Sequence, residues 1–266
     1  MTPPPSRLHR AAGWCVHLYT ALGLVCGLYT LFAIVDGRPN DAFLWMTIAI
    51  VIDGSDGIFA RAAKVKEVVP EYDGRKLDDI TDYLNYVFLP VYFAARFKLI
   101  PGGWEPVLAL PLLASAYGFC SSGAKTSDGY FTGFPSTWNV VVFYQFVLGM
   151  PPVWAALVLA FLSVMVFVPI RYLHPTQSPH YRRLSIALTV AWMLAVLLML
   201  RDVEHVPRWL ACGSLAYPAY YVGLSFYLHF IRDPVASDPG RPRSGASPDP
   251  SRAPSATSNA PPPFPP

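Results

Sequence analysis

The sequence predicts an all-α polytopic membrane protein with about eight transmembrane helices. Apolar residues make up 53% of the 266 residues and the mean hydropathy is +0.36. Apolar runs of about 15–25 residues recur along the chain, close to the ~20 residues that a helix needs to cross a bilayer. A membrane β-barrel would instead require short segments of alternating hydrophobicity, which the sequence lacks.

The candidate spans follow one another from residue 11 to residue 231. The first stands behind Arg7 and Arg10 and exceeds the ~7–15-residue apolar core of a cleavable signal, so we expect it to be retained. The fourth contains Pro106 and Pro111, and the fifth is short. The spans are predicted at 11–35, 41–60, 80–98, 105–121, 136–150, 152–170, 184–200 and 208–231.

The distribution of positive charge predicts the orientation. If the N-terminus and the even-numbered connections are inside, most of the 20 Lys and Arg residues face the cytosol, as the positive-inside rule requires. We therefore expect a cytoplasmic segment at 1–10, a transmembrane domain at 11–231, and a cytoplasmic tail at 232–266. The tail is rich in Pro and Ser and is predicted to be disordered.

Composition also excludes several classes of function. The net charge of +3 is small and dispersed, so no nucleic-acid partner is expected. The four cysteines lie inside or at the edges of the spans without metal-ligand spacing, which indicates neither a zinc site nor a disulfide framework.

A charged stretch, DGSDGIFARAAKVKEVVPEYDGRKLDDITD, interrupts the apolar pattern at residues 53–82. If the second span continues as a helix, one face carries Asp53, Asp56, Gly57, Ala60 and Arg61. The small side chains at positions 57 and 60 would leave room for a ligand beside the two carboxylates.

The next helix repeats this arrangement after a break near Pro70. Gly74, Asp78 and Asp82 follow at steps of four residues and so share one face. Two such helices side by side would bring together four carboxylates, which repel one another at a low-dielectric boundary unless cations occupy the site. Oxygen ligands favour Mg²⁺ or Mn²⁺, and two such ions would suit phosphoryl transfer.

A simpler role remains open for the aspartates that lie off these faces. Asp73 and Asp79 would neutralise the basic side chains of the same cytosolic stretch. Those side chains are Lys64, Lys66, Arg75 and Lys76.

The segments DGSDGIFAR and GRKLDDITD together resemble the aspartate signature of the CDP-alcohol phosphatidyltransferases. The resemblance implies that a hydroxyl attacks the lipid-bearing phosphate of a CDP-linked lipid, that CMP leaves, and that Asp82 is the general base. It implies metal ligands at Asp53, Asp56, Asp78 and Asp82, and nucleotide contacts from Asp56, Gly57, Ala60, Arg61 and Gly74. Twelve residues separate Arg61 from Gly74, about four more than the family pattern has.

A broader resemblance, over residues 10–231, points to the branch of bacterial phosphatidylcholine synthases. It rests on AAGWCVHLYTALGL, KVKEVVPEYDG and DGYFTGFPSTWNVVVFY. It implies CDP-diacylglycerol and choline as substrates, the bilayer of the bacterial inner membrane as surroundings, an active site facing the cytoplasm, and a homodimer.

The residues themselves favour a cationic acceptor over one that carries phosphate. The loop 121–136 offers one basic residue, Lys125, whereas a phosphate needs several. Aromatic faces can hold a quaternary ammonium group, and the candidates are Tyr130, Phe131, Phe134 and Trp138. Serine or a polyol stays open as the acceptor. A cation-coupled transporter is a more distant alternative, typically with charges on broken helices at mid-membrane.

Overall fold

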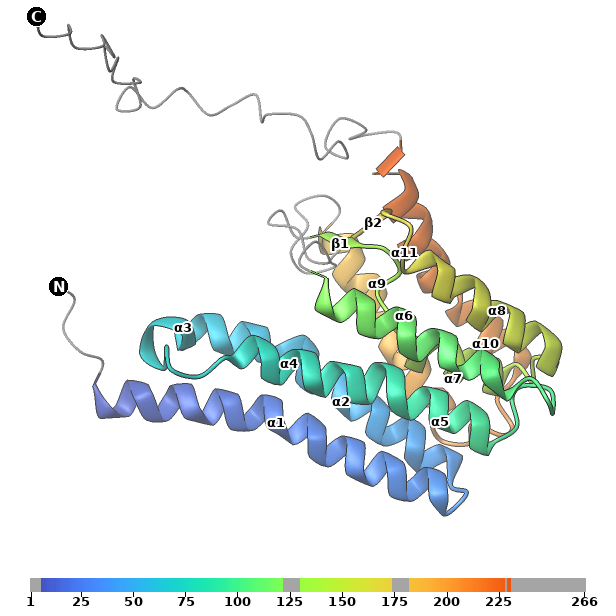
Figure 1. The fold of residues 1–266 in the computed structure, drawn as a ribbon, viewed down its shortest axis with the longest axis horizontal. Coiled ribbons are helices and arrows are strands. Elements are labelled where there is room, and N and C mark those ends of the chain that lie inside the picture. Colours follow the sequence, from blue (N-terminus) through green and yellow to red (C-terminus); the bar gives the residue numbers. More distant parts are fainter. Residues whose placement is uncertain (1–5, 122–129, 174–181, 228, 231–266) are drawn as a thin grey trace, which may run out of the picture.

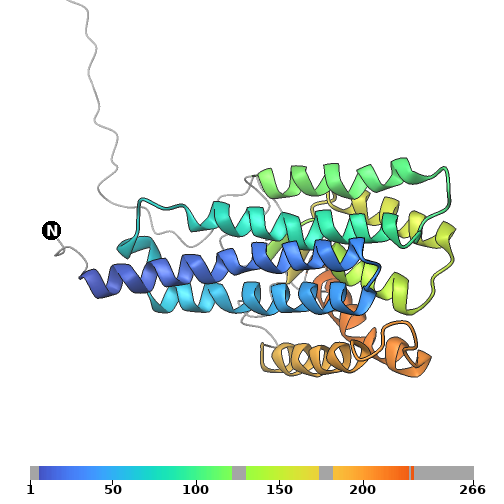
Figure 2. The ribbon, with the colours of Figure 1, turned by 90° about the horizontal axis from the view of Figure 1, so that it is seen from below.

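The computed structural model describes residues 6–121, 130–173, 182–227 and 229–230, which fold into a bundle of helices (Figure 1). In chain order the helices are α1 Arg7–Val35, α2 Pro39–Ala62, α3 Val65–Val68, α4 Gly74–Asp82, η1 Tyr83–Phe88, α5 Leu89–Arg96, η2 Glu105–Leu108, α6 Ala109–Cys120, α7 Trp138–Val147, α8 Pro152–Met165, α9 Arg182–Met199, α10 Arg208–Ser214 and α11 Ala216–Tyr227. Seen from below, α6 and α9 lie on opposite edges of the bundle (Figure 2).

Each predicted span coincides with helical structure, so the all-α prediction is confirmed in its main part. The sequence reading missed one feature: β1 Tyr130–Thr132 and β2 Arg171–Leu173 form an antiparallel ribbon, with Tyr130 opposite Leu173. The last predicted span is divided between α10 and α11. The predicted tail at 232–266 lies outside the described residues.

Two helices, α1 and α2, are long and apolar enough to cross a membrane. In α1 only 39% of the most apolar window is buried, and Leu18, Leu22 and Phe32 are exposed. A core helix of a water-soluble protein would be mostly buried, so these outward apolar faces are typical of a membrane protein. The count of about eight spans stays a prediction.

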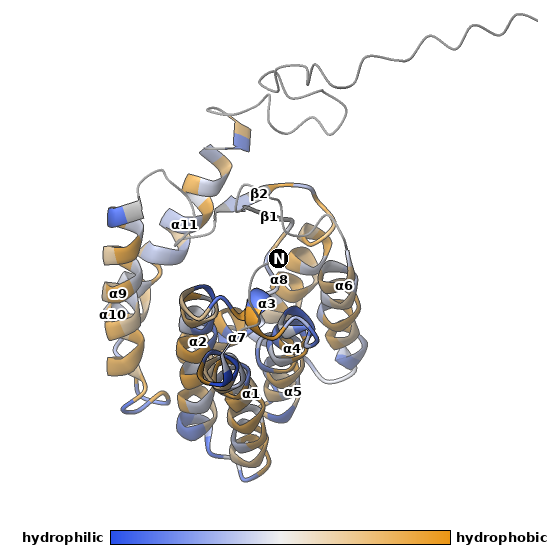
Figure 3. Cartoon of the chain, turned by 90° about the vertical axis from the view of Figure 1, so that its left-hand side faces the viewer, coloured by the Kyte–Doolittle hydropathy of each residue, from blue (hydrophilic) through white to orange (hydrophobic). Residues whose placement is uncertain are grey.

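Polar residues gather at the end of the bundle where α1 begins, α2 ends and α4 begins (Figure 3). There Arg10 of α1 pairs with Glu71 of the link between α3 and α4. The pKa of the Glu71 carboxylate is lowered, first by a hydrogen bond from its own backbone N–H and then by Arg10. The ion pair ties the charged link to α1.

Helix α1 approaches the helix of the acidic signature closely because glycines face it. A Cβ atom on Gly23 would overlap the Thr81 methyl group, and one on Gly27 would lie 2.7 Å from Leu84 Cδ2. The side chain of Asn85 reinforces this contact, because its Nδ2 donates to the carbonyl of Gly23 at 3.0 Å. The G-x-x-x-G spacing is typical of close helix packing in membranes.

The segments α4, η1 and α5 form one continuous helix from Gly74 to Arg96. Asp73 begins it by accepting hydrogen bonds from the backbone N–H groups of Arg75 and Lys76, at 3.2 and 3.3 Å. Asp73 also pairs with the Lys76 ammonium group at 3.8 Å, as the neutralising role predicted. The π-helical η1 follows directly after Asp82, and such wide turns are frequent at functional sites.

Candidate functional site

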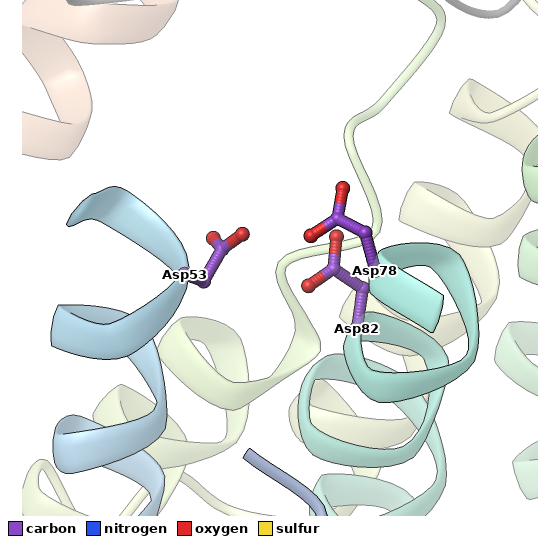
Figure 4. Close-up of side chains that lie close together, drawn as sticks. All are labelled: Asp53, Asp78 and Asp82. Atoms are coloured by element: carbon purple, nitrogen blue, oxygen red, sulfur yellow. The ribbon is translucent and has the colours of Figure 1, made fainter. Parts of the chain in front are cut away.

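Three carboxylates from two helices face one another at the centre of the candidate site (Figure 4). Asp53 comes from α2, whereas Asp78 and Asp82 come from α4. One oxygen atom from each of the three lies within 4.8 Å of the others, and all three side chains are partly buried. The predicted convergence of the two acidic faces is therefore present for these three residues.

The fourth predicted ligand, Asp56, lies on the same cleft but outside this group of three. Its side chain is 8% exposed, and its Oδ2 accepts a hydrogen bond from Thr20 Oγ1 of α1 at 2.8 Å. Helix α1 therefore reaches the acidic face of α2 as well as packing on α4.

Like Asp56, Asp53 accepts a hydrogen bond from a hydroxyl group, but this hydroxyl comes from a different helix. Tyr86 of η1 donates from its hydroxyl to Asp53 Oδ2 at 2.8 Å. The two α2 carboxylates thus each accept a hydroxyl hydrogen bond, one from α1 and one from η1, and these bonds restrict where the carboxylate oxygens point.

These residues line a cleft with about 230 Å³ of space, part of which is open to solvent. Its walls are Thr20, Ala49, Ile52, Asp53, Asp56, Asp78, Thr81, Asp82, Asn85 and Tyr86. Asn85 is 2% exposed, and its Oδ1 has no hydrogen-bond partner among the described residues. The cleft therefore offers a further oxygen besides the carboxylates.

The donor set fits a hard divalent cation. Clustered carboxylate oxygens in a partly buried site repel one another, and a cation of the Mg²⁺ or Mn²⁺ type removes that repulsion. Among the described residues, Asp53, Asp78 and Asp82 are the group whose geometry can hold such an ion.

Three predicted nucleotide contacts, Gly57, Ala60 and Arg61, follow Asp56 on α2, but none of them is among the residues that line the cleft. A Cβ atom on Gly57 would lie 3.2 Å from Arg61 Nη1, so the guanidinium group lies beside the bare backbone of this turn. Gly57 and Ala60 are partly exposed and Arg61 is exposed. Gly74 instead faces α1, where an added Cβ would lie 2.7 Å from His17 Cε1. Its small size is thus used for helix packing.

Of the four aromatic side chains predicted to bind choline as a cage, the structure describes those of Phe134 and Trp138. Trp138 is fully buried and donates from Nε1 to Ser115 Oγ at 2.8 Å, with the Phe134 ring centroid 5.1 Å from its own. Neither residue is among those that line the cleft. The side chains of Tyr130 and Phe131, like Lys125, lie outside the described residues, so the cage stays a prediction.

Sequence reasoning did not assign Thr20, Asn85 or Tyr86 to the site. Tyr86 carried a signal, because it follows Asp82 by four residues and so continues the acidic face. Thr20 had none: its contact with Asp56 joins residues 36 positions apart in the sequence.

A second cavity lies between α2, α7 and α9, with about 290 Å³ of space that is partly open to solvent. Its lining is mostly apolar: Phe43, Met46, Thr47, Ile50, Asn139, Val140, Phe143, Trp192 and Val196. Asn139 is 4% exposed, and its Nδ2 has no hydrogen-bond partner among the described residues.

Comparison with known proteins gives a consistent set of relatives. The chain is 36% identical over 230 residues to the phosphatidylcholine synthase of Pseudomonas aeruginosa, covering 85% of this chain and 94% of the relative. It is 39% identical over 178 residues to that of Borreliella burgdorferi, covering 66% and 76%. It is 33% identical over 233 residues to that of Legionella pneumophila, covering 84% and 91%. No protein-family model matches the chain.

Proposed function

The chain belongs to the phosphatidylcholine synthase family, and we propose that it transfers the phosphatidyl group of CDP-diacylglycerol to choline with release of CMP. The observation that carries the proposal is the convergence of Asp53, Asp78 and Asp82 across the cleft. A site of clustered carboxylates suits a substrate that brings phosphate groups together with divalent cations.

Asp53, Asp78 and Asp82 would hold the metal, and Asp56 would be a ligand of a second ion. A divalent ion supplies positive charge that offsets the phosphate oxygens and the charge that develops on them. Mn²⁺ and Mg²⁺ both fit oxygen ligands of this kind.

Asp82 accepts the proton in the proposed reaction. The choline hydroxyl oxygen forms a bond to the lipid-bearing phosphorus as its proton passes to the Asp82 carboxylate. The bond between that phosphorus and the bridging oxygen breaks, and CMP leaves with the electron pair. Asp82 suits this role because it is one turn from Asp78 on the same helix, beside the atoms that hold the phosphate.

The open end of the cleft would bind the nucleotide. Gly57 and Ala60 have little or no side chain, which would leave room for the nucleotide against α2. The exposed Arg61 guanidinium can donate to phosphate oxygens. Of the other two predicted nucleotide contacts, Asp56 lines the cleft, whereas Gly74 packs against His17 of α1. Aromatic side chains are the proposed partners of the quaternary ammonium group, and the predicted set is Tyr130, Phe131, Phe134 and Trp138.

We place the protein in the bacterial inner membrane, crossing it several times with the cleft open to the cytoplasm. The polar end of the bundle supports this orientation, because Arg10 of α1 pairs there with Glu71 of the charged link and Arg61 lies in the last turn of α2. We also propose a homodimer, as the family resemblance implies.

One assay tests the proposal. Purified full-length protein is given CDP-diacylglycerol and Mn²⁺ with choline, serine or glycerol phosphate in parallel, and CMP release is measured before and after chelation of the metal. We expect release with choline, and loss of release on chelation. A preference for serine would refute the acceptor but leave the phosphatidyl transfer intact, whereas ion transport without CMP release would refute the enzyme itself.

A further inference from the structure

We propose that Tyr86 is a positioning residue, which holds Asp53 in the orientation that binds the metal. The proposal rests on the proposed function, because it assumes that the acidic cleft holds a divalent cation. Its basis is one contact, the 2.8 Å hydrogen bond from the Tyr86 hydroxyl to Asp53 Oδ2.

The contact joins the two sides of the cleft. Asp53 is the single member of the three-carboxylate group that comes from α2, whereas Asp78 and Asp82 share α4. Tyr86 belongs to the same continuous helix as those two. The hydrogen bond therefore fixes the α2 carboxylate to the helix that carries the other ligands.

A carboxylate has two oxygens, and an exposed one can rotate between several orientations. When Oδ2 accepts the hydrogen bond from the Tyr86 hydroxyl, rotation of the Asp53 carboxylate is restricted. Carboxylate ligands in metal sites are commonly held by such outer hydrogen bonds, whose loss typically weakens metal binding by about 10–100-fold. The Tyr86 ring lines the cleft and packs against the hydrophobic core, so its hydroxyl has little freedom to move away.

Helix geometry explains why the Tyr86 hydroxyl can reach Asp53. Tyr86 follows Asp82 by four residues and lies within the π-helical segment Tyr83–Phe88. This segment directly continues α4. The helical register that directs Asp78 and Asp82 to the cleft therefore also directs Tyr86 to it.

The test compares Tyr86→Phe with a matched control on the same segment. Tyr83→Phe also removes one hydroxyl, but that hydroxyl donates to the carbonyl of Leu112 at 2.9 Å and does not line the cleft. Mn²⁺ binding to each purified full-length protein is measured by electron paramagnetic resonance without lipid or choline. CMP release is then measured as a function of Mn²⁺ concentration.

We expect Tyr86→Phe to weaken Mn²⁺ binding at least about 10-fold and to recover most of its maximal rate when Mn²⁺ is saturating. Tyr83→Phe should bind Mn²⁺ like the wild type. Equal Mn²⁺ binding in Tyr86→Phe and the wild type would overturn this inference and leave the proposed function standing. A wild-type protein that binds no Mn²⁺ would instead overturn the metal requirement itself, and this inference with it.

A double-mutant cycle distinguishes positioning from a general loss of structure. If Tyr86 acts through Asp53, Tyr86→Phe should weaken Mn²⁺ binding little further in a protein that already carries Asp53→Asn. Additive losses in the double variant would show that the tyrosine acts by another route and would overturn the proposal.

Discussion

Two cavities border different faces of α2, and they are built in different ways. The acidic cleft takes its walls from α1, α2, α4 and η1, and side-chain hydrogen bonds between helices hold its polar groups. The cavity between α2, α7 and α9 is lined mostly by apolar side chains. One helix therefore borders a polar site on one face and a mostly apolar cavity on the other.

Each cavity contains one buried asparagine, and the two asparagines differ in their hydrogen bonds. Asn85, in the cleft, donates from Nδ2 to the carbonyls of Gly23 in α1 and Thr81 in α4, and so ties α1 to the helix that carries Asp78 and Asp82. Asn139, in the apolar cavity, accepts the N–H of the adjacent Val140 and leaves its Nδ2 without a partner among the described residues. Polar groups that join helices should be costly to remove, and a polar group that joins none should not.

The largest expected effect is on catalysis in the cleft. Asp82→Asn preserves size but removes the charge that is proposed to accept the hydroxyl proton, so CMP release should fall at least about 10²-fold. The protein should still fold, with an apparent Tm in detergent close to that of the wild type. Near-normal turnover in this variant would refute the assignment of Asp82 as the base.

The next effect concerns the contact between α1 and α4. Gly23→Ala places a methyl group against Thr81 Cγ2, and such overpacking should destabilise the protein by about 1–3 kcal/mol, measured by reversible unfolding in mixed micelles. Gly223→Ala in α11 is the matched control, because an added Cβ there has no atom within 4 Å. It should leave stability unchanged or slightly raised.

A compensating substitution sharpens this test. Thr81→Ser removes the obstructing methyl group and keeps the hydroxyl that donates to the Leu77 carbonyl. Gly23→Ala combined with Thr81→Ser should therefore recover stability that Gly23→Ala alone loses. If it does not, the two residues are not in direct contact.

A smaller loss is expected from Asn85→Leu. The substitution removes the hydrogen bonds to the carbonyls of Gly23 and Thr81, at 3.0 and 2.9 Å, and should cost about 1–2 kcal/mol of unfolding free energy. The same unfolding measurement applies. An unchanged stability would mean that the glycine contacts alone hold α1 in place.

The smallest effect is expected for Asn139→Leu, the matched change in the apolar cavity. The Val140 N–H keeps the Thr137 carbonyl as an acceptor, and an unpartnered buried donor is removed. The unfolding free energy should therefore change by less than about 1 kcal/mol. A loss as large as that of Asn85→Leu would show that Asn139 has a structural partner, and the contrast between the two cavities would fail.

Much of the fold could be predicted because its signals are local. Apolar runs predicted a helix at each span, and the spacing of Asp78 and Asp82 predicted a shared face, since both follow from the helical repeat. The short ribbon of β1 and β2 was not predicted, because it pairs two brief segments that lie far apart in the sequence.

The sequence by itself determined which residues are acidic, which helices carry them and which face they occupy. Only the tertiary structure decided how the four carboxylates divide: Asp53 joins Asp78 and Asp82, and Asp56 accepts its hydrogen bond from Thr20. The tertiary structure also decided that Trp138 is a core residue that donates a hydrogen bond to Ser115. The physical reason is that the hydrogen bonds of Asp53 and Asp56 join residues 33 and 36 positions apart, and their lengths depend on how closely whole helices approach.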